Sequence, residues 1–361
     1  MKNTVRILIL SITVFALALV LSACAYIWGP SLAGYDQPDE PAESEQPRTH
    51  SPSFAGSDEP DQPQGLAFSS NGDGTCAVVG IGSHTDGALV IPSTSPDGDA
   101  VTSVGSRAFR GCAFLTSVTI PDSVTSIGDS AFAKCTALRT VTIGKGVTSV
   151  EKRAFDECAI TSATLPIIAI SSVPKNELQT IVITGNEASS EIGRSVYFAD
   201  YPKLTSVTIG DGVTSIGSYA FTLCSGLKSV TIGNDVTSIG SWAFNDCTGL
   251  TAVAIGNSVT SIGNAAFCDC SKLISITIPE GVTTIGQVAF IGCSGLTSVT
   301  LPKSIVSIGN SAFANCTALT SFVYRGTKAQ WDEVKTGADW RKGTGVGIIY
   351  CTDGYTSVNP Y

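Results

Sequence analysis

The sequence predicts a β-rich solenoid, a right-handed stack of about eleven coils that is capped at both ends. An Ala-Phe pair recurs in it at a step of 23 residues within two blocks, with the phenylalanine at Phe109, Phe132, Phe155, Phe221, Phe244, Phe267, Phe290 and Phe313. A cysteine follows each of these phenylalanines three residues later. Charged residues make up only 14% of the chain, against about 25% in average proteins. A fixed period of this length is typical of a solenoid, in which each repeat buries its apolar face only against its neighbours.

One repeat, LKSVTIGNDVTSIGSWAFNDCTG at residues 227–249, shows how a coil is built. Val230 and Ile232 alternate with hydroxyl residues, which is the period of a strand with one buried face. The following Val-Thr-Ser-Ile predicts a second, shorter strand, and Gly240 predicts a close bend or a positive φ. The segment SWAFNDC is too short for a full helix and predicts a short helical or 3₁₀ turn.

Residues 1–24 have the pattern of a lipoprotein signal peptide. Lys2 and Arg6 give the positively charged first region of a signal peptide, and the apolar run that follows is short for a membrane span. Leu-Ser-Ala directly before Cys24 matches the lipobox of bacterial lipoproteins, in which the thiol accepts a diacylglycerol. We therefore expect lipidation of Cys24, with an uncleaved transmembrane anchor as the alternative.

Residues 25–65 predict a disordered, acidic, Pro-rich tether. Seven prolines lie between Pro30 and Pro63, and nine acids accompany the single base Arg48 over residues 25–75. Such a composition cannot bury a core. The formal net charge of −9 is therefore concentrated in the tether and identifies no partner. The alternative to a plain tether is an acidic interaction motif in this segment.

Residues 66–100 predict an N-terminal cap and the first coil. The Asn-Gly-Asp-Gly turn at residues 71–74 lies between two apolar segments, as in a β-hairpin, and ALVIP at residues 88–92 is the first strand. The repeat solenoid then occupies residues 101–324. One inward residue per coil gives eleven coils, at Ile91, Ile120, Ile143, Leu165, Ile183, Ile209, Ile232, Ile255, Ile278, Leu301 and Tyr324.

The period is irregular at residues 159–204, which we interpret as one shortened and one lengthened coil. Phe198 keeps the step to Phe221, but Tyr201 replaces the cysteine. Loops on a rigid scaffold commonly carry recognition, so the connections here are a candidate binding site, and tolerated drift of the period is the alternative. A Gly/Ser loop in place of residues 167–178 is expected to leave the fold intact. The candidate binding residues are Lys175, Glu177, Glu187, Glu191 and Arg194.

Residues 325–361 predict a C-terminal cap. Thr327 and Gln330 have the spacing of a capping box, which opens a short helix carrying Trp331. Trp340 and the apolar residues 348–350 add bulk. We expect hydrophobic closure of the last coil, with a carbohydrate-stacking site as the alternative.

The cysteines and histidines indicate neither a metal site nor a cofactor. Stacked ladder cysteines lie about 4.8 Å apart and point the same way, whereas a disulfide requires roughly 3.5–4.5 Å between Cβ atoms. We therefore expect buried, reduced thiols. His50 lies in the tether and His84 in the N-terminal cap, and the sequence has no zinc-binding, nucleophile-elbow or phosphate-loop motif.

The outward strand positions form flat columns of small hydroxyl residues with no basic patch for nucleic acid. Threonine pairing that supports the sheet and a broad contact surface for protein or glycan are both open interpretations. One column is Ser117, Thr140, Ser206, Ser229, Ala252, Ser275, Ser298 and Ser321, and the next is Thr119, Thr142, Thr208, Thr231, Ala254, Thr277 and Thr300.

The repeat Leu-x-x-Val-x-Ile-(Pro/Gly)-x-x-Val-Thr-Ser-Ile-Gly-x-x-Ala-Phe-x-x-Cys closely resembles that of the BspA-type leucine-rich repeat surface proteins. The resemblance covers about residues 66–354, and YRGTKAQWDEVKTGADW resembles the terminal cap of that family. It implies a leucine-rich-repeat-like fold and a bacterial surface location. It implies adhesion only in general terms, since no family motif fixes a ligand.

Together these features predict a lipid-anchored, non-catalytic binding or adhesion protein. We expect it to be extracytoplasmic, attached to the bacterial membrane through its N-terminal lipid, and exposed at the surface. Its partner would be a host matrix protein, a glycan or another cell-surface protein, and not a nucleic acid. The alternatives are a structural spacer with no specific ligand, and an enzyme with a site in residues 159–204.

Overall fold

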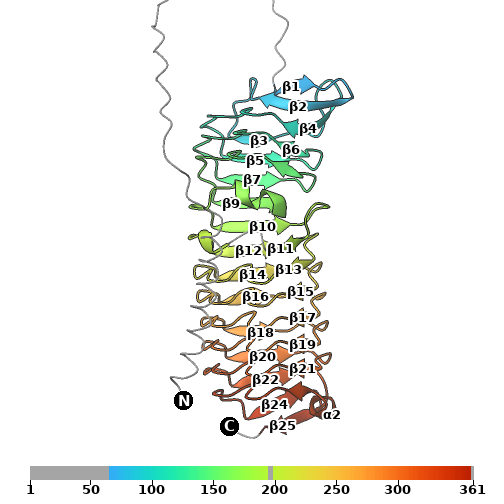
Figure 1. The fold of residues 1–361 in the computed structure, drawn as a ribbon, viewed down its shortest axis with the longest axis vertical. Helices are drawn as coiled ribbons and strands as arrows, with labels where there is room; N and C mark the ends of the chain where they lie inside the picture. Colours follow the sequence, from blue (N-terminus) through green and yellow to red (C-terminus); the bar gives the residue numbers. More distant parts are fainter. Residues whose placement is uncertain (1–64, 194–197, 359–361) are drawn as a thin grey trace, which may run out of the picture. The chain divides into compact units, whose positions relative to one another are not determined.

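The computed structural model describes residues 65–193 and 198–358. In this part of the chain, parallel strands from successive coils stack on one another (Figure 1). The expected signal peptide, and all but the last residue of the expected tether, lie outside the described residues.

Each coil contributes one longer strand to a first layer, and equivalent residues pair in parallel, as Val207 does with Val230. All eleven predicted coils are present, and β24 (Ile348–Cys351) adds a twelfth strand through Val323 and Tyr350. Among the described residues, no strand pairing joins β16 to β18, so this layer consists of two sheets. The eleven strands are β3 (Ala88–Val90), β5 (Ser117–Ile120), β7 (Thr140–Ile143), β9 (Ser162–Pro166), β10 (Thr180–Thr184), β12 (Ser206–Ile209), β14 (Ser229–Ile232), β16 (Ala252–Ala254), β18 (Ser275–Thr277), β20 (Ser298–Leu301) and β22 (Ser321–Tyr324).

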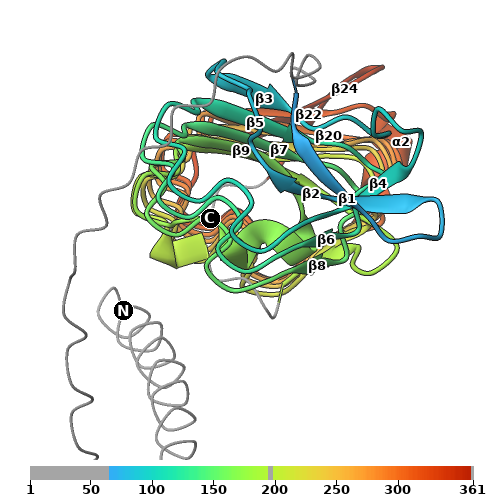
Figure 2. The same ribbon diagram turned by 90° about the horizontal axis from the view of Figure 1, so that it is seen from above.

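The predicted second strand is present in every coil but the shortened one, and these strands form another layer, on a different side of the coil from the first (Figure 2). Threonine suits this layer because its hydroxyl reaches the previous coil: Thr237 Oγ1 donates to the Thr214 carbonyl at 3.1 Å. Glycine follows the strand at Gly240 because the backbone of the previous coil lies close to it. An added Cβ would lie 2.7 Å from backbone atoms of Gly217 and Ser218. The strands are β4 (Ala100–Val104), β6 (Ser126–Ile127), β8 (Ser149–Val150), β11 (Glu191–Ile192), β13 (Ser215–Ile216), β15 (Ser238–Ile239), β17 (Ser261–Ile262), β19 (Thr284–Ile285), β21 (Ser307–Ile308) and β23 (Lys335–Thr336).

A ladder of phenylalanine rings forms the centre of the core. The rings of one block stack with centroids 4.4–5.2 Å apart, from Phe198 through Phe313, and those of Phe109, Phe132 and Phe155 form a shorter stack. All of these rings are at most 1% exposed. Burial of like residues in successive coils explains why the sequence keeps phenylalanine at this position.

The segment between the second strand and the next coil differs from the predicted helical turn. Tight turns are present, for example from the Asn245 amide to the Trp242 carbonyl at 3.2 Å, but Trp242 and Asp246 have φ of 61° and 56°. These left-handed residues direct their amides to the next coil, where the Asp246 amide donates to the Cys268 carbonyl at 2.9 Å. The turn therefore adds hydrogen bonds between coils. In a helical turn, the same amides would donate to carbonyls of their own coil.

Both ends of the stack contain the predicted elements. β1 (Ala67–Ser70) and β2 (Thr75–Gly80) form an antiparallel hairpin, and β2 pairs with β4. At the other end, α2 (Lys328–Asp332) begins with the capping box of Thr327 and Gln330. Trp331 and Trp340 pack against Phe322, and β24 pairs with β25 (Gly354–Ser357), so hydrophobic closure is the role the structure supports for this cap.

The ladder cysteines lie beside the phenylalanines as free thiols. Cys247 Sγ donates to the Phe221 carbonyl and Cys293 Sγ to the Phe267 carbonyl, each at 3.1 Å. Burial raises the pKa of the Cys293 thiol well above its ordinary value. The thiolate is the reactive form, so the Cys293 thiol is held in its unreactive form.

We therefore expect Cys247 and Cys293 to resist a thiol reagent in the native protein and to react once the chain is denatured. Half-buried Cys351 should be labelled faster and serves as the internal comparison. Mass spectrometry of the labelled peptides measures each site. A disulfide between Cys247 and either Cys224 or Cys270 would contradict this prediction.

Candidate functional site

The irregular segment contains the shortened and lengthened coils predicted from the sequence. Thr180 of β10 lies opposite Ser162 of β9, 18 residues earlier, and Thr205 bonds to Gln179, 26 residues earlier, whereas the regular step is 23. In the shortened coil, the 3₁₀ helix η1 (Ile167–Ser172) lies against β8 where a second strand would otherwise be. The second layer is therefore interrupted between β8 and β11.

Polar contacts bind the two irregular coils to each other. Lys175 Nζ pairs with Asp200 Oδ2 at 2.8 Å, and Lys203 Nζ pairs with Glu177 Oε2 at 2.7 Å. Tyr201, which replaces the ladder cysteine, donates its hydroxyl to the Ile170 carbonyl at 3.1 Å. Burial raises the pKa of Tyr201 to about 12, so the hydroxyl remains a donor. The replacement thus supplies a longer donor that reaches across the altered spacing.

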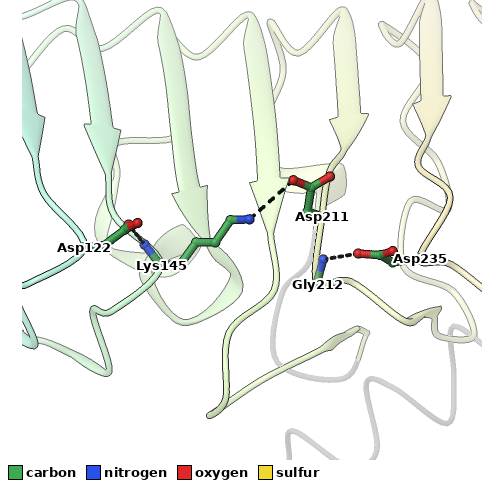
Figure 3. A network of polar contacts seen from close by, with 5 residues as sticks. All are labelled: Asp122, Lys145, Asp211, Gly212 and Asp235. Carbon is green, nitrogen blue, oxygen red and sulfur yellow. Dashed lines mark hydrogen bonds and ion pairs between the residues drawn. The ribbon is translucent and has the colours of Figure 1, made fainter.

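A second polar network connects the regular coils on either side of the irregular segment (Figure 3). Lys145, in the loop after β7, reaches toward Asp211, in the loop after β12, with 3.4 Å between Nζ and Oδ2. Strands β9 and β10 lie between β7 and β12 in the sheet. Asp122 and Asp235 accept backbone amides of neighbouring coils, from Lys145 and Gly212, each at 2.7 Å. These carboxylates fix the loops, because each satisfies a backbone donor of an adjacent coil, the following one for Asp122 and the preceding one for Asp235.

The structure divides the predicted binding residues into two groups on either side of β10. Lys175 and Glu177 precede the strand, and their charges are compensated by Asp200 and Lys203. Glu187 and Glu191 follow it, are exposed, and make no ion pair within the described residues. Arg194 lies outside the described residues. The four described residues therefore do not form a single cluster.

The expectation that residues 167–178 are a replaceable loop is wrong. Ile167, Ala169, Ile170, Val173 and Leu178 are each at most 4% exposed and belong to the core. A Gly/Ser replacement would remove their apolar contacts and destabilise the stack. The sequence does not reveal this burial, because the apolar residues of η1 follow neither the alternation of a strand nor the 23-residue repeat. Only exposed positions such as Ile168 and Lys175 can be varied to test binding.

The hydroxyl columns lie on the outward face of the first layer. Ser229 Oγ of the columns donates to Ser206 Oγ at 3.2 Å, and in the irregular coils Thr180 Oγ1 donates to Ser162 Oγ at 2.9 Å. These bonds support the sheet and leave a uniform, uncharged face. The columns end at β22 and β24, where Val323 pairs with half-exposed Tyr350.

The described residues contain no group of three or more histidine, cysteine, aspartate or glutamate side chains placed to hold a metal ion. Among the same residues, no helix has the length and apolar character needed to cross a membrane. Cys24, the expected lipidation site, lies outside them.

These features define a class, the parallel-strand repeat solenoid of the leucine-rich type. The family model described as "BspA type Leucine rich repeat region" matches residues 102–187 and 190–320, in six copies. The chain belongs to this BspA-type leucine-rich repeat family, and the resemblance seen in the repeats is confirmed.

Several solved structures are similar to this chain. A leucine rich cell surface protein from Faecalibacterium prausnitzii is 25% identical, with 77% of this chain and 98% of that chain covered and a TM-score of 0.36. A leucine-rich repeat protein from Bacteroides ovatus is 22% identical, with 78% and 97% covered and a TM-score of 0.34. One from Eubacterium ventriosum is 22% identical, with 76% and 91% covered and a TM-score of 0.38. Comparison with curated proteins gave no match.

Proposed function

We propose that this chain is a lipid-anchored, non-catalytic binding or adhesion protein of the bacterial surface, with the irregular coils as its principal contact site. Membership of the BspA-type family supports a repeat-based binding role. The lipobox before Cys24 supports an extracytoplasmic location. The partner would be a host matrix protein, a glycan or another cell-surface protein.

The observation that carries the proposal is that the described residues of the period break belong to the stack. The strands on either side keep their pairing through β7, β9, β10 and β12. Ion pairs and the Tyr201 hydrogen bond fix the connections around them. Recognition residues are commonly carried by irregular connections on a rigid scaffold. The regular coils, by contrast, repeat the same small hydroxyl residues.

A surface-only substitution test follows from the two groups of charged residues. One variant combines Lys175→Ala with Glu177→Ala, and the other combines Glu187→Ala with Glu191→Ala. Binding of the full chain to immobilised matrix proteins and to a glycan array is measured first, and each variant is then titrated against any partner found. We expect at least one variant to weaken binding about tenfold, or ~1.4 kcal/mol.

The matched control combines Lys228→Ala with Lys272→Ala, two exposed lysines of regular coils. It should change the affinity by less than about twofold, because isolated surface substitutions have small effects. If both test variants bind as the unaltered chain does, the contact site lies elsewhere, and the hydroxyl columns are the next surface to test. If no partner is found in the screen, a spacer role is favoured.

A further inference from the structure

The first layer of strands is interrupted between two regular coils, those of β16 and β18. In Figure 1, β18 follows β16 directly along the stack, yet no strand pairing joins them among the described residues. On this side of the coils, one long hydrogen bond runs from the Ile274 amide to the Thr251 carbonyl, at 3.4 Å. The two strands are therefore neighbours in the stack that do not form a continuous sheet.

The interruption opens the edge of the core to solvent. In the coil of β14, the inward residues Val230 and Ile232 are 2% and 3% exposed. The equivalent residues of the β16 coil, Val253 and Ile255, are only half-buried. The inward pair of the β18 coil is again buried. Among the described first-layer pairs, the loss of burial is thus confined to the coil that borders the interruption.

The side chains at this junction explain part of the interruption. Several regular coils enter the first layer with a threonine whose hydroxyl reaches the preceding coil, as Thr297 Oγ1 does to the Ile274 carbonyl at 3.0 Å. The β18 coil has Ile274 itself at this position, and isoleucine has no hydroxyl. In β16, Ala252 and Ala254 interrupt the hydroxyl columns, and alanine is unfavourable in strands.

A missing backbone donor explains the rest. In the β14 coil, the Gly233 amide leaves the strand and donates to the Ile209 carbonyl at 2.8 Å. Pro279 is the equivalent residue of the β18 coil, and proline has no amide hydrogen. Pro302 lacks the same donor in the next coil, but that coil keeps the hydroxyl of Thr297. Among the coils of β5 to β22, only that of β18 lacks both donors.

The other sides of these two coils remain bonded to each other. In the second layer, Ser261 of β17 pairs with Thr284 of β19. In the turns, the Phe267 amide donates to the Ala289 carbonyl at 2.8 Å, and the rings of Phe267 and Phe290 stack at 5.2 Å. The junction is therefore attached along two sides and open along the third.

We propose that this junction is a hinge at which the solenoid bends. The coils up to β17 form one block and those from β18 onward form the other, because strand pairing is continuous from β12 to β16 and again from β18 to β22. The second layer is the pivot, and the first layer opens and closes between β16 and β18. Repeats interact only with their neighbours, so one weak junction localises the movement. Bending changes the angle between the irregular coils and the C-terminal cap.

Spin labels placed across the hinge and beside it test this proposal by pulsed electron spin resonance, which measures the distribution of distances between two labels. One pair, Thr208→Cys with Val323→Cys, spans the hinge. The control pair, Thr119→Cys with Thr231→Cys, spans the same number of coils on one side of it. Both pairs lie about 24 Å apart at the spacing of paired strands.

The labelled chains carry Cys112→Ser and Cys351→Ser, because these two cysteines are only half-buried. We expect the distribution across the hinge to be about twice as wide as that of the control pair or wider, because conformations of different bend coexist. Ile274→Thr combined with Pro279→Gly restores both missing donors and should narrow the distribution to the control width. Pro302→Gly adds a donor where the sheet is already continuous and should leave the distribution wide.

Hydrogen exchange of the unaltered chain is a second measurement, which needs neither label nor variant. The Ile255 amide has no hydrogen-bond partner in the described chain, whereas the equivalent Ile278 amide donates to the Thr300 carbonyl at 2.9 Å. The Ile255 amide should therefore exchange about a hundredfold faster or more. The Ile274→Thr, Pro279→Gly chain should slow this exchange.

Circular dichroism confirms that each variant is folded. Equal widths for the two label pairs overturn the proposal, as does a width that the restored donors leave unchanged. So does an Ile255 amide as protected as that of Ile278. None of these measurements requires a partner, so failure of the hinge and failure of the proposed binding role are distinguishable.

Discussion

Phe244→Ala is expected to lower the free energy of unfolding by about 3–5 kcal/mol. The Phe244 ring is fully buried and stacks on Phe221 at 5.0 Å and on Phe267 at 5.1 Å. Truncation therefore removes two ring contacts and leaves a cavity between three coils. Urea unfolding followed by circular dichroism measures the loss, and hydrogen exchange shows which coils lose protection first.

Two further variants separate the ladder from general burial. Phe109 begins its stack and has a ring partner only in Phe132 among the described residues, so Phe109→Ala should cost less than Phe244→Ala. Thr231→Ala, on the exposed face of the neighbouring strand β14, should change stability by less than about 0.5 kcal/mol. Hydrogen-exchange protection lost evenly over the whole stack would contradict the nearest-neighbour coupling assumed here.

Most of the fold could be predicted because the same sequence pattern occurs in many repeats. The strand alternation of Val230 and Ile232 is present in coil after coil, so a local ambiguity in one unit is resolved by the others. The hairpin turn at Asn71–Gly74 and the capping box at Thr327 are local motifs with their own geometry, and both are present.

The turn conformation was missed, although half of it had a sequence signal. Gly111 and Gly292 occupy the position of Asp246, and glycine alternating with aspartate and asparagine is typical of a left-handed residue. The other left-handed position of the turn has no such signal: Tyr219 and Trp242 occupy it, and tyrosine and tryptophan rarely adopt positive φ. There the hydrogen bonds to the next coil determine the conformation, and these are not local to the turn.

The irregular coils were located correctly, but their inner and outer residues could not be assigned. With the step changed to 18 and then 26 residues, position in the repeat no longer indicates burial. Ile170 lies in the core and Ile168 on the surface, only two residues apart in η1. The partners of Lys175 and Glu177 lie 25 and 26 residues away, so their charge compensation depends on the tertiary fold.

Cys24→Ser is expected to abolish attachment of lipid to this chain. Leu-Ser-Ala-Cys at residues 21–24 is the only basis for lipidation, because Cys24 lies outside the described residues. A diacylglycerol supplies two acyl chains, and each buried methylene contributes about 0.8 kcal/mol to membrane binding. Serine lacks the thiol that accepts the lipid, so the whole of this contribution is lost.

Metabolic labelling of cells with a radioactive fatty acid, followed by immunoprecipitation, measures this loss directly. The unaltered chain should carry label, and the variant should carry none, whether it is released or retained as an uncleaved precursor. Membrane fractionation alone would not suffice, because a retained signal segment could hold the precursor at the membrane. Cys351→Ser, at a half-buried position in the C-terminal cap, should be labelled normally. Equal label on the Cys24→Ser chain would show that the lipid, if present, is attached at another residue.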